Sequence, residues 1–118
     1  MSWSKWFVFI FSVSVLGAPL AARAVDKTRA DEQAGAILFR DKGCAHCHGD
    51  TLEGTKKAPS IKDIDKDPAW TTAKMTDQIL NGGQKMPPFS DSLTDDEIAR
   101  IVRYLRAKNR PSPPPAEP

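Results

Sequence analysis

The pentapeptide Cys44-Ala45-His46-Cys47-His48 places two thiols and an imidazole within five residues, and the fold of the rest of the chain depends on what they bind. Two thiols three positions apart can add to the two vinyl groups of one porphyrin and form thioethers. The imidazole of the following residue can then ligate the iron. This C-x-x-C-H spacing is the attachment motif of a c-type haem. We therefore predict one haem c, covalently bound through Cys44 and Cys47, with His48 as the proximal iron ligand.

The opposite side of the iron requires a second ligand or an open site. His46 lies between the two anchoring cysteines and cannot reach the other face of the same ring. Met75, Met86, a lysine and water remain as candidates. Met75 falls in a predicted helix, where filling the core is its expected role. Met86 lies in a glycine-containing loop and precedes two prolines that stiffen the chain. Met86 is therefore the predicted ligand, and Met75 is the reserve.

The N-terminal residues 1–24 have the features of a secretory signal peptide. A charged start at Lys5 precedes the apolar stretch from Trp6 to Leu16, and Ala22-Arg23-Ala24 provides a small-x-small cleavage site. Cleavage would place the protein in the periplasm or at the outer face of the cytoplasmic membrane, without stable membrane insertion. The alternative is an uncleaved anchor, because the apolar stretch is nearly long enough to span a bilayer.

Charge and size restrict the function of the chain beyond the signal. Residues 1–24 hold two of the 17 Lys and Arg and none of the 15 Asp and Glu, so the remainder has a formal net charge of zero. Nothing in this balance favours nucleic-acid binding. Residues 110–118 (RPSPPPAEP) are predicted to be a disordered tail. Residues 25–109 then form one small domain, which needs a cofactor or staple because its own core is marginal.

Helical periodicity predicts an all-α fold with about three main helices and irregular loops, and the C-x-x-C-H motif predicts the one covalent haem around which they wrap. The first helix is expected from Arg29 to Arg40 and the second from Trp70 to Leu80. The third begins at a capping box formed by Thr94 and Glu97. Gly35 lies inside the first predicted helix, and because it has no side chain we expect another helix to cross closely at this point.

Residues 30–108 resemble a class I cytochrome c, with the matching segments in the same order along the chain. The resemblance is strongest to the small bacterial monohaem type, which is also seen as haem domains of oxidase subunits. The resemblance implies a cytochrome c domain at 25–109 with His48 and Met86 as axial ligands. It also implies electron transfer without catalysis. The Pro59 carbonyl would accept the Nδ1–H of His48, and Trp70 would pack on the haem or donate to a propionate. The matching features are Gly35 and Phe39, Cys44 to Gly49, Ala58 to Ile61, Ile79 to Gly82, Met86 to Phe89, and Leu93 to Leu105 with Tyr104.

Three other classes fit the sequence less well. A thiol–disulfide oxidoreductase would need a βαβ pattern, and a zinc site would need four ligands from five consecutive residues. A haem peroxidase would require Met86 to dissociate. Within electron transfer, a monomeric shuttle between membrane oxidoreductase complexes or periplasmic dehydrogenases is favoured. The alternative is a dedicated haem subunit of a dehydrogenase or oxidase complex. Lys42 and Lys85 would favour an acidic partner.

Overall fold

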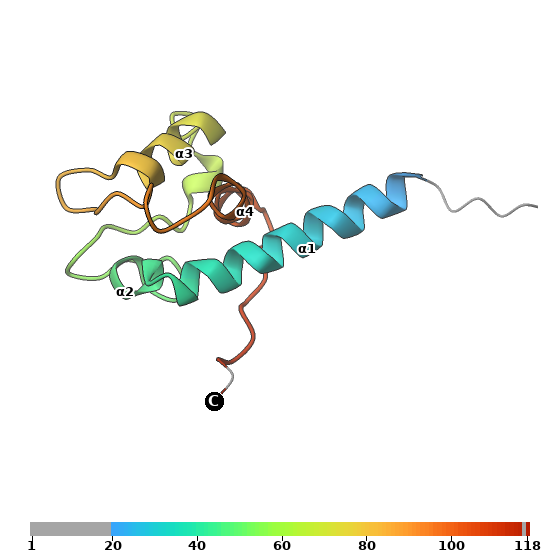
Figure 1. Cartoon of the computed structure of the whole chain (residues 1–118), viewed down its shortest axis with the longest axis horizontal. Helices are drawn as coiled ribbons and strands as arrows, with labels where there is room; N and C mark the ends of the chain where they lie inside the picture. The colour runs from blue at the N-terminus through green and yellow to red at the C-terminus, as the bar shows by residue number, and fades with distance from the viewer. Residues whose placement is uncertain (1–19, 117) are drawn as a thin grey trace, which may run out of the picture.

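The computed structural model describes residues 20–116 and 118, which form helices joined by irregular loops (Figure 1). No strand occurs in this part of the chain, and the predicted all-α class is confirmed. Most of the predicted signal peptide, residues 1–19, lies outside the described residues. None of the helices in the described part combines the length and apolar character needed to cross a bilayer. The elements are α1 (Leu20–Asp41), α2 (Cys44–His48), the 3-10 turn η1 (Ile64–Lys66), α3 (Thr72–Asn81) and α4 (Asp95–Arg106).

The crossing of α1 over α4 organises the fold. Figure 1 shows α4 almost end-on where α1 runs across the picture, so the two helices cross steeply. A Cβ atom on Gly35 would lie 2.1 Å from the carbonyl oxygen of Arg100 and 2.8 Å from the Cβ of Tyr104. The rings of Phe39 and Tyr104 pack beside this point, with centroids 5.6 Å apart. The predicted close crossing at Gly35 is confirmed.

The helix boundaries depart from the predictions mainly at the start of α1. This helix begins at Leu20 rather than Arg29. The additional residues are mostly alanine, leucine and charged residues with good helix propensity, and no proline interrupts them. In a helix that began at Arg29, the acidic Asp31 would lie in the first turn, where carboxylates are favoured; it is instead in the helix interior and forms an ion pair with Arg103 of α4. The predicted start of the helix at Arg29 was wrong, because Asp31 pairs with a side chain of α4 instead of marking the first turn of α1.

The starts of α3 and α4 are set by side-chain caps. The Thr71 hydroxyl accepts from the amide of Lys74 at 3.2 Å, so α3 starts two residues after Trp70. The predicted capping box of α4 is confirmed, since the amide of Glu97 donates to the Thr94 hydroxyl and the Glu97 carboxylate accepts from the Thr94 amide.

The buried apolar residues lie between α1, α3 and α4. Leu52, in the loop after α2, joins them with a left-handed backbone (φ 65°) and only 1% exposure. The loops after α2 and after α3 extend to the same side of α4 in Figure 1. They therefore face each other beside the core, which contains Ala36, Phe39, Leu52, Met75, Ile79, Leu93, Ile98, Ile101, Val102, Tyr104 and Leu105.

Candidate haem site

The C-x-x-C-H motif forms α2, a short helix that the periodicity of the sequence did not indicate. Gly43 has a left-handed backbone (φ 83°) that turns the chain from α1 into α2, and its carbonyl accepts from the amide of His46 at 3.1 Å. Residues three and four apart share one face of a helix. The two free thiols, Cys44 and Cys47, therefore lie on the same side of α2 as His48.

The loop after α2 holds the motif by binding its last carbonyl groups. The amide of Gly54 donates to the carbonyl of His48 at 2.8 Å, and the Thr55 hydroxyl donates to the carbonyl of Cys47 at 2.7 Å. These carbonyls have no partner further along so short a helix. The loop thus fixes the end of α2 that carries the imidazole.

The two histidines of the motif have different surroundings. His46 is exposed, and its Nε2 lies 2.8 Å from the ammonium of Lys57. His48 is half-buried, and burial lowers its pKa, an effect that the backbone carbonyl of Pro59 opposes. This carbonyl does not reach hydrogen-bond geometry, so the buried Nδ1 of His48 has no partner among the described residues. Burial favours the neutral imidazole, which is the form that binds a metal.

The loop after α3 presents Met86 through a tight backbone turn. Gly82 has φ 69°, and a Cβ there would lie 2.4 Å from the carbonyl oxygen of Met86. The same carbonyl accepts from the amide of Gly83 at 2.8 Å. The amide of Phe89 donates to the carbonyl of Ile79 at 3.0 Å, which closes the loop back onto α3. The position of Met86 is therefore fixed on both sides.

Sequence reasoning did not identify the partner of the Met86 sulfur. The Nε2 of Gln78 lies 3.9 Å from Sδ of Met86 in hydrogen-bonding geometry. Gln78 is three residues after Met75, so both side chains lie on the same face of α3. This spacing is the sequence signal from which a role of Gln78 near the site could have been predicted. Met75 itself is 2% exposed and belongs to the core.

One open cavity of about 420 Å³ brings the four predicted site residues together. Cys44, Cys47 and His48 line it from α2, and Met86 lines it from the loop after α3. An adjoining hollow of about 90 Å³ shares Cys44, His48 and Met86, and is lined by Met75 and other core residues. The rest of the larger cavity is lined in part by apolar side chains, namely Ala58, Pro59, Ile61, Trp70, Pro87 and Phe89.

The chemistry of this cavity fits a covalent haem. Its donors are two thiols, one imidazole and one thioether, and its walls are mainly apolar. Imidazole and thioether are the axial ligands of cytochromes c. Burial, with a smaller contribution from Cys47, raises the pKa of Cys44 to about 11, so this sulfur remains a neutral thiol before attachment. Trp70 is half-buried at the wall, with the ammonium of Lys74 4.4 Å from its ring centroid.

Comparisons with known proteins extend beyond the haem motif. Residues 30–105, more than half of the chain, match the family described as cytochrome c oxidase, cbb3-type, subunit III. The cytochrome c6 of Rippkaea orientalis (strain PCC 8801 / RF-1) is 30% identical over 105 residues, which cover 87% of each chain. The cytochrome bc1 complex cytochrome c subunit of Corynebacterium diphtheriae is 39% identical over 90 residues, covering 70% of this chain and 30% of that protein. The crystal structure of the c-type cytochrome XoxG from Methylobacterium extorquens AM1 has a TM-score of 0.60 and 25% identity, covering 71% of this chain and 57% of that one.

These matches confirm the resemblance to class I cytochromes c that the motifs predicted. They also establish the cofactor as a covalently bound haem c, and the role as one-haem electron transfer rather than catalysis. The chain belongs to the family of cbb3-type cytochrome c oxidase subunit III and is a small class I c-type cytochrome.

Proposed function

We propose that this cytochrome is an exported electron shuttle, with its haem attached to Cys44 and Cys47 and its iron held between His48 and Met86. One observation carries the proposal: all four side chains line the same cavity, although Met86 is 38 residues away from His48 in the sequence. Thioether bonds to two cysteines would keep the cofactor from dissociating and fix its orientation. His48 would then bind from the side of α2.

Met86 is a better distal ligand than Met75 for two structural reasons. It is half-buried in a loop that lines both hollows, whereas Met75 is packed in the core and lines only the smaller one. The contact from Gln78 also orients the Met86 sulfur and leaves it a lone pair for a metal. Moving Met75 to the iron would remove a buried side chain from the core, which is costly.

The residues of the cavity favour simple electron transfer. A haem iron with histidine and methionine ligands takes up and releases single electrons at a raised potential. The apolar wall limits water near the metal and disfavours the additional positive charge of the ferric state. Among the described residues, no carboxylate lines the cavity, so the wall lacks a distal acid of the kind that peroxide cleavage uses.

Export and partner choice are supported by separate features of the chain. The signal-like residues 1–24 and the similarity to cytochrome c6 support export. Lys57 and Lys85 both line the open cavity and would attract an acidic partner, whereas Lys42 is engaged with Glu97 at 3.7 Å. A membrane complex of the bc1 or cbb3 class is the proposed partner. If docking is electrostatic, association will slow as ionic strength rises.

A second candidate function is a permanent haem subunit of such a complex, which the family match to an oxidase subunit favours. Native gels of membranes and of the periplasmic fraction separate the two functions. A shuttle migrates alone in the periplasmic fraction. A stoichiometric partner that survives gentle solubilisation would support the subunit instead.

The ligand assignment is tested by spectroscopy of protein made in cells with working cytochrome maturation. Met86→Leu and Met75→Leu conserve volume and form a matched pair. We expect the sulfur–iron charge-transfer band of the ferric protein to disappear in Met86→Leu and to remain in Met75→Leu. Colourless wild-type protein, or loss of the band only in the Met75 variant, would contradict the proposal.

A further inference from the structure

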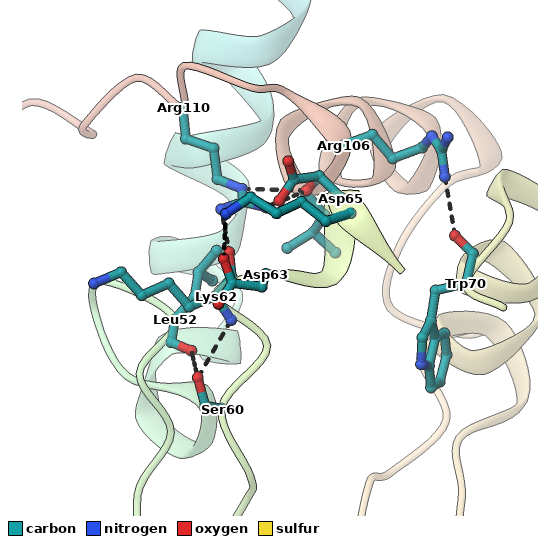
Figure 2. Close-up of polar contacts among 10 residues, drawn as sticks. Leu52, Ser60, Lys62, Asp63, Asp65, Trp70, Arg106 and Arg110 are labelled. Carbon is teal, nitrogen blue, oxygen red and sulfur yellow. Dashed lines mark hydrogen bonds and ion pairs between the residues drawn. The ribbon is translucent and has the colours of Figure 1, made fainter. Parts of the chain in front are cut away.

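The side chain of Arg110 joins the segment of Lys62 and Asp65 to the end of α4 (Figure 2). In the sequence, its proline-rich surroundings predict the start of a disordered tail. Its Nη1 donates to the carbonyl of Lys62 at 2.7 Å, and its Nη2 donates to Oδ1 of Asp65 at 2.7 Å. Nε and Nη2 also donate to the carbonyl of Leu105, at 3.1 and 2.7 Å. We call this set of contacts the Arg110 clamp.

Each contact of the clamp is made to a cavity-lining residue or to its immediate neighbour. Lys62 follows Ile61 and Asp65 follows Ile64, and both isoleucines line the smaller hollow. Leu105, at the end of α4, lines that hollow itself. The Arg110 guanidinium therefore holds Ile61 and Ile64 close to the C-terminal end of α4.

The clamp is stronger than an ordinary surface ion pair. The side chains of Arg110 and Asp65 are only 16% and 12% exposed, so water screens their attraction weakly. Charge-assisted hydrogen bonds from a planar guanidinium are also directional, and lysine cannot reproduce them. Other hydrogen bonds join this segment to the loop after α2 or to itself, among them the Ile61 amide to the Leu52 carbonyl at 2.9 Å and the Ile64 amide to the Ile61 carbonyl at 3.2 Å. The clamp differs from these bonds because it ties the segment to Leu105 at the end of α4.

We propose that Arg110 is a positioning residue for the haem: through Lys62 and Asp65 it holds Ile61 and Ile64 in place and keeps water out of this side of the cavity. The inference rests on the proposed function, because it assumes that the cavity holds the haem. Without the clamp, the wall would loosen and water would reach the site. Water stabilises the more highly charged ferric state, so the midpoint potential would fall.

The sign of the potential change separates positioning from a simple charge effect. Removing a positive charge from Arg110 would lower the potential through space, and removing a negative charge from Asp65 would raise it. Loss of the clamp lowers the potential in both cases. We therefore compare Arg110→Gln and Asp65→Ala in the full-length holoprotein by spectroelectrochemistry. Lys108→Gln is the matched control, since Lys108 is exposed and its replacement removes the same charge two residues away.

We expect both clamp variants to have a lower midpoint potential than the wild type, with Lys108→Gln close to the wild type. Hydrogen exchange gives a second readout: the amide of Ile64 should exchange about tenfold faster, or more, in both variants and not in the control. Shifts of opposite sign, or unchanged exchange at Ile64, would overturn the inference. Failure of the proposed function is recognised separately, because wild-type protein would then lack haem or the sulfur–iron band.

Discussion

Replacing Gly35 with alanine tests the helix crossing on which the fold depends. The added Cβ would lie 2.1 Å from the carbonyl oxygen of Arg100 and 2.7 Å from its carbonyl carbon. Ordinary carbon–oxygen contacts are about 3.3–3.6 Å, so α1 and α4 would have to separate by more than about 1 Å. Both partners of the clash are fixed to helix backbones, and no side-chain rotation can relieve it.

The expected loss of folding free energy is the cost of overpacking minus the gain from the better helix propensity of alanine. Overpacking of this kind costs up to about 3 kcal/mol, and alanine regains about 0.5–1 kcal/mol over glycine inside a helix. The net loss should be about 2 kcal/mol, which in a domain of this size lowers the melting temperature by about 8–16 °C. Circular dichroism of the ferric holoprotein during heating measures the shift.

A matched glycine controls for the effect of alanine on the unfolded chain. At Gly83 a new Cβ would meet only the flexible end of the Gln78 side chain, 2.8 Å from its Nε2. We expect Gly83→Ala to melt within a few degrees of the wild type, because a flexible side chain can move away. A Gly35→Ala protein that melts at or above the wild-type temperature would refute the reasoning, since helix propensity would then outweigh the contact with Arg100.

Two further predictions concern acid stability and redox tuning. The pKa of Glu97 is held below its usual 4.5, first by the Thr94 amide that donates to it. The ionised cap thus stabilises the fold above about pH 4.5 and is lost as the pH falls further. Glu97→Gln should therefore melt below the wild type at pH 7 and close to it at pH 3; an equal gap at both pH values would contradict this. Gln78→Leu should lower the midpoint potential by about 20–60 mV, because it removes an amide dipole that points its positive end at the Met86 sulfur. An unchanged or higher potential in spectroelectrochemistry would show that this contact does not tune the site.

The parts of this fold that the sequence predicts are those with local causes. Cys44, Cys47 and His48 are adjacent in the chain, so their shared chemistry is visible without a structure. The capping box at Thr94 is equally local. The start of α1 was predicted wrongly because Asp31 looks like an N-terminal residue by itself, whereas in the fold it is bound by Arg103 from a helix 72 residues away.

Contacts between distant segments were not predictable in the same way. Leu52 adopts a left-handed backbone that leucine seldom takes, and only the tertiary structure explains it, because the side chain is buried in the core. Its carbonyl accepts from the amide of Ile61 at 2.9 Å. It also accepts from the hydroxyl of Ser60 at 3.3 Å, as Figure 2 shows. The strained residue thus connects the loop after α2 with the cavity wall.

The same distinction bears on what makes one cytochrome differ from another. The residues proposed to bind the iron belong to short motifs, whereas the potential of a haem depends on the polarity and water access of its surroundings. Here those surroundings are set by Gln78 on α3, by Arg106, whose Nη1 donates to the carbonyl of Trp70 at 2.9 Å, and by Arg110 beyond α4. Figure 2 shows both arginines extending from the C-terminal end of α4 to the segment that carries Lys62, Asp65 and Trp70. Because this segment forms part of the cavity wall, substitutions after α4 should alter the redox behaviour even though every proposed ligand is unchanged.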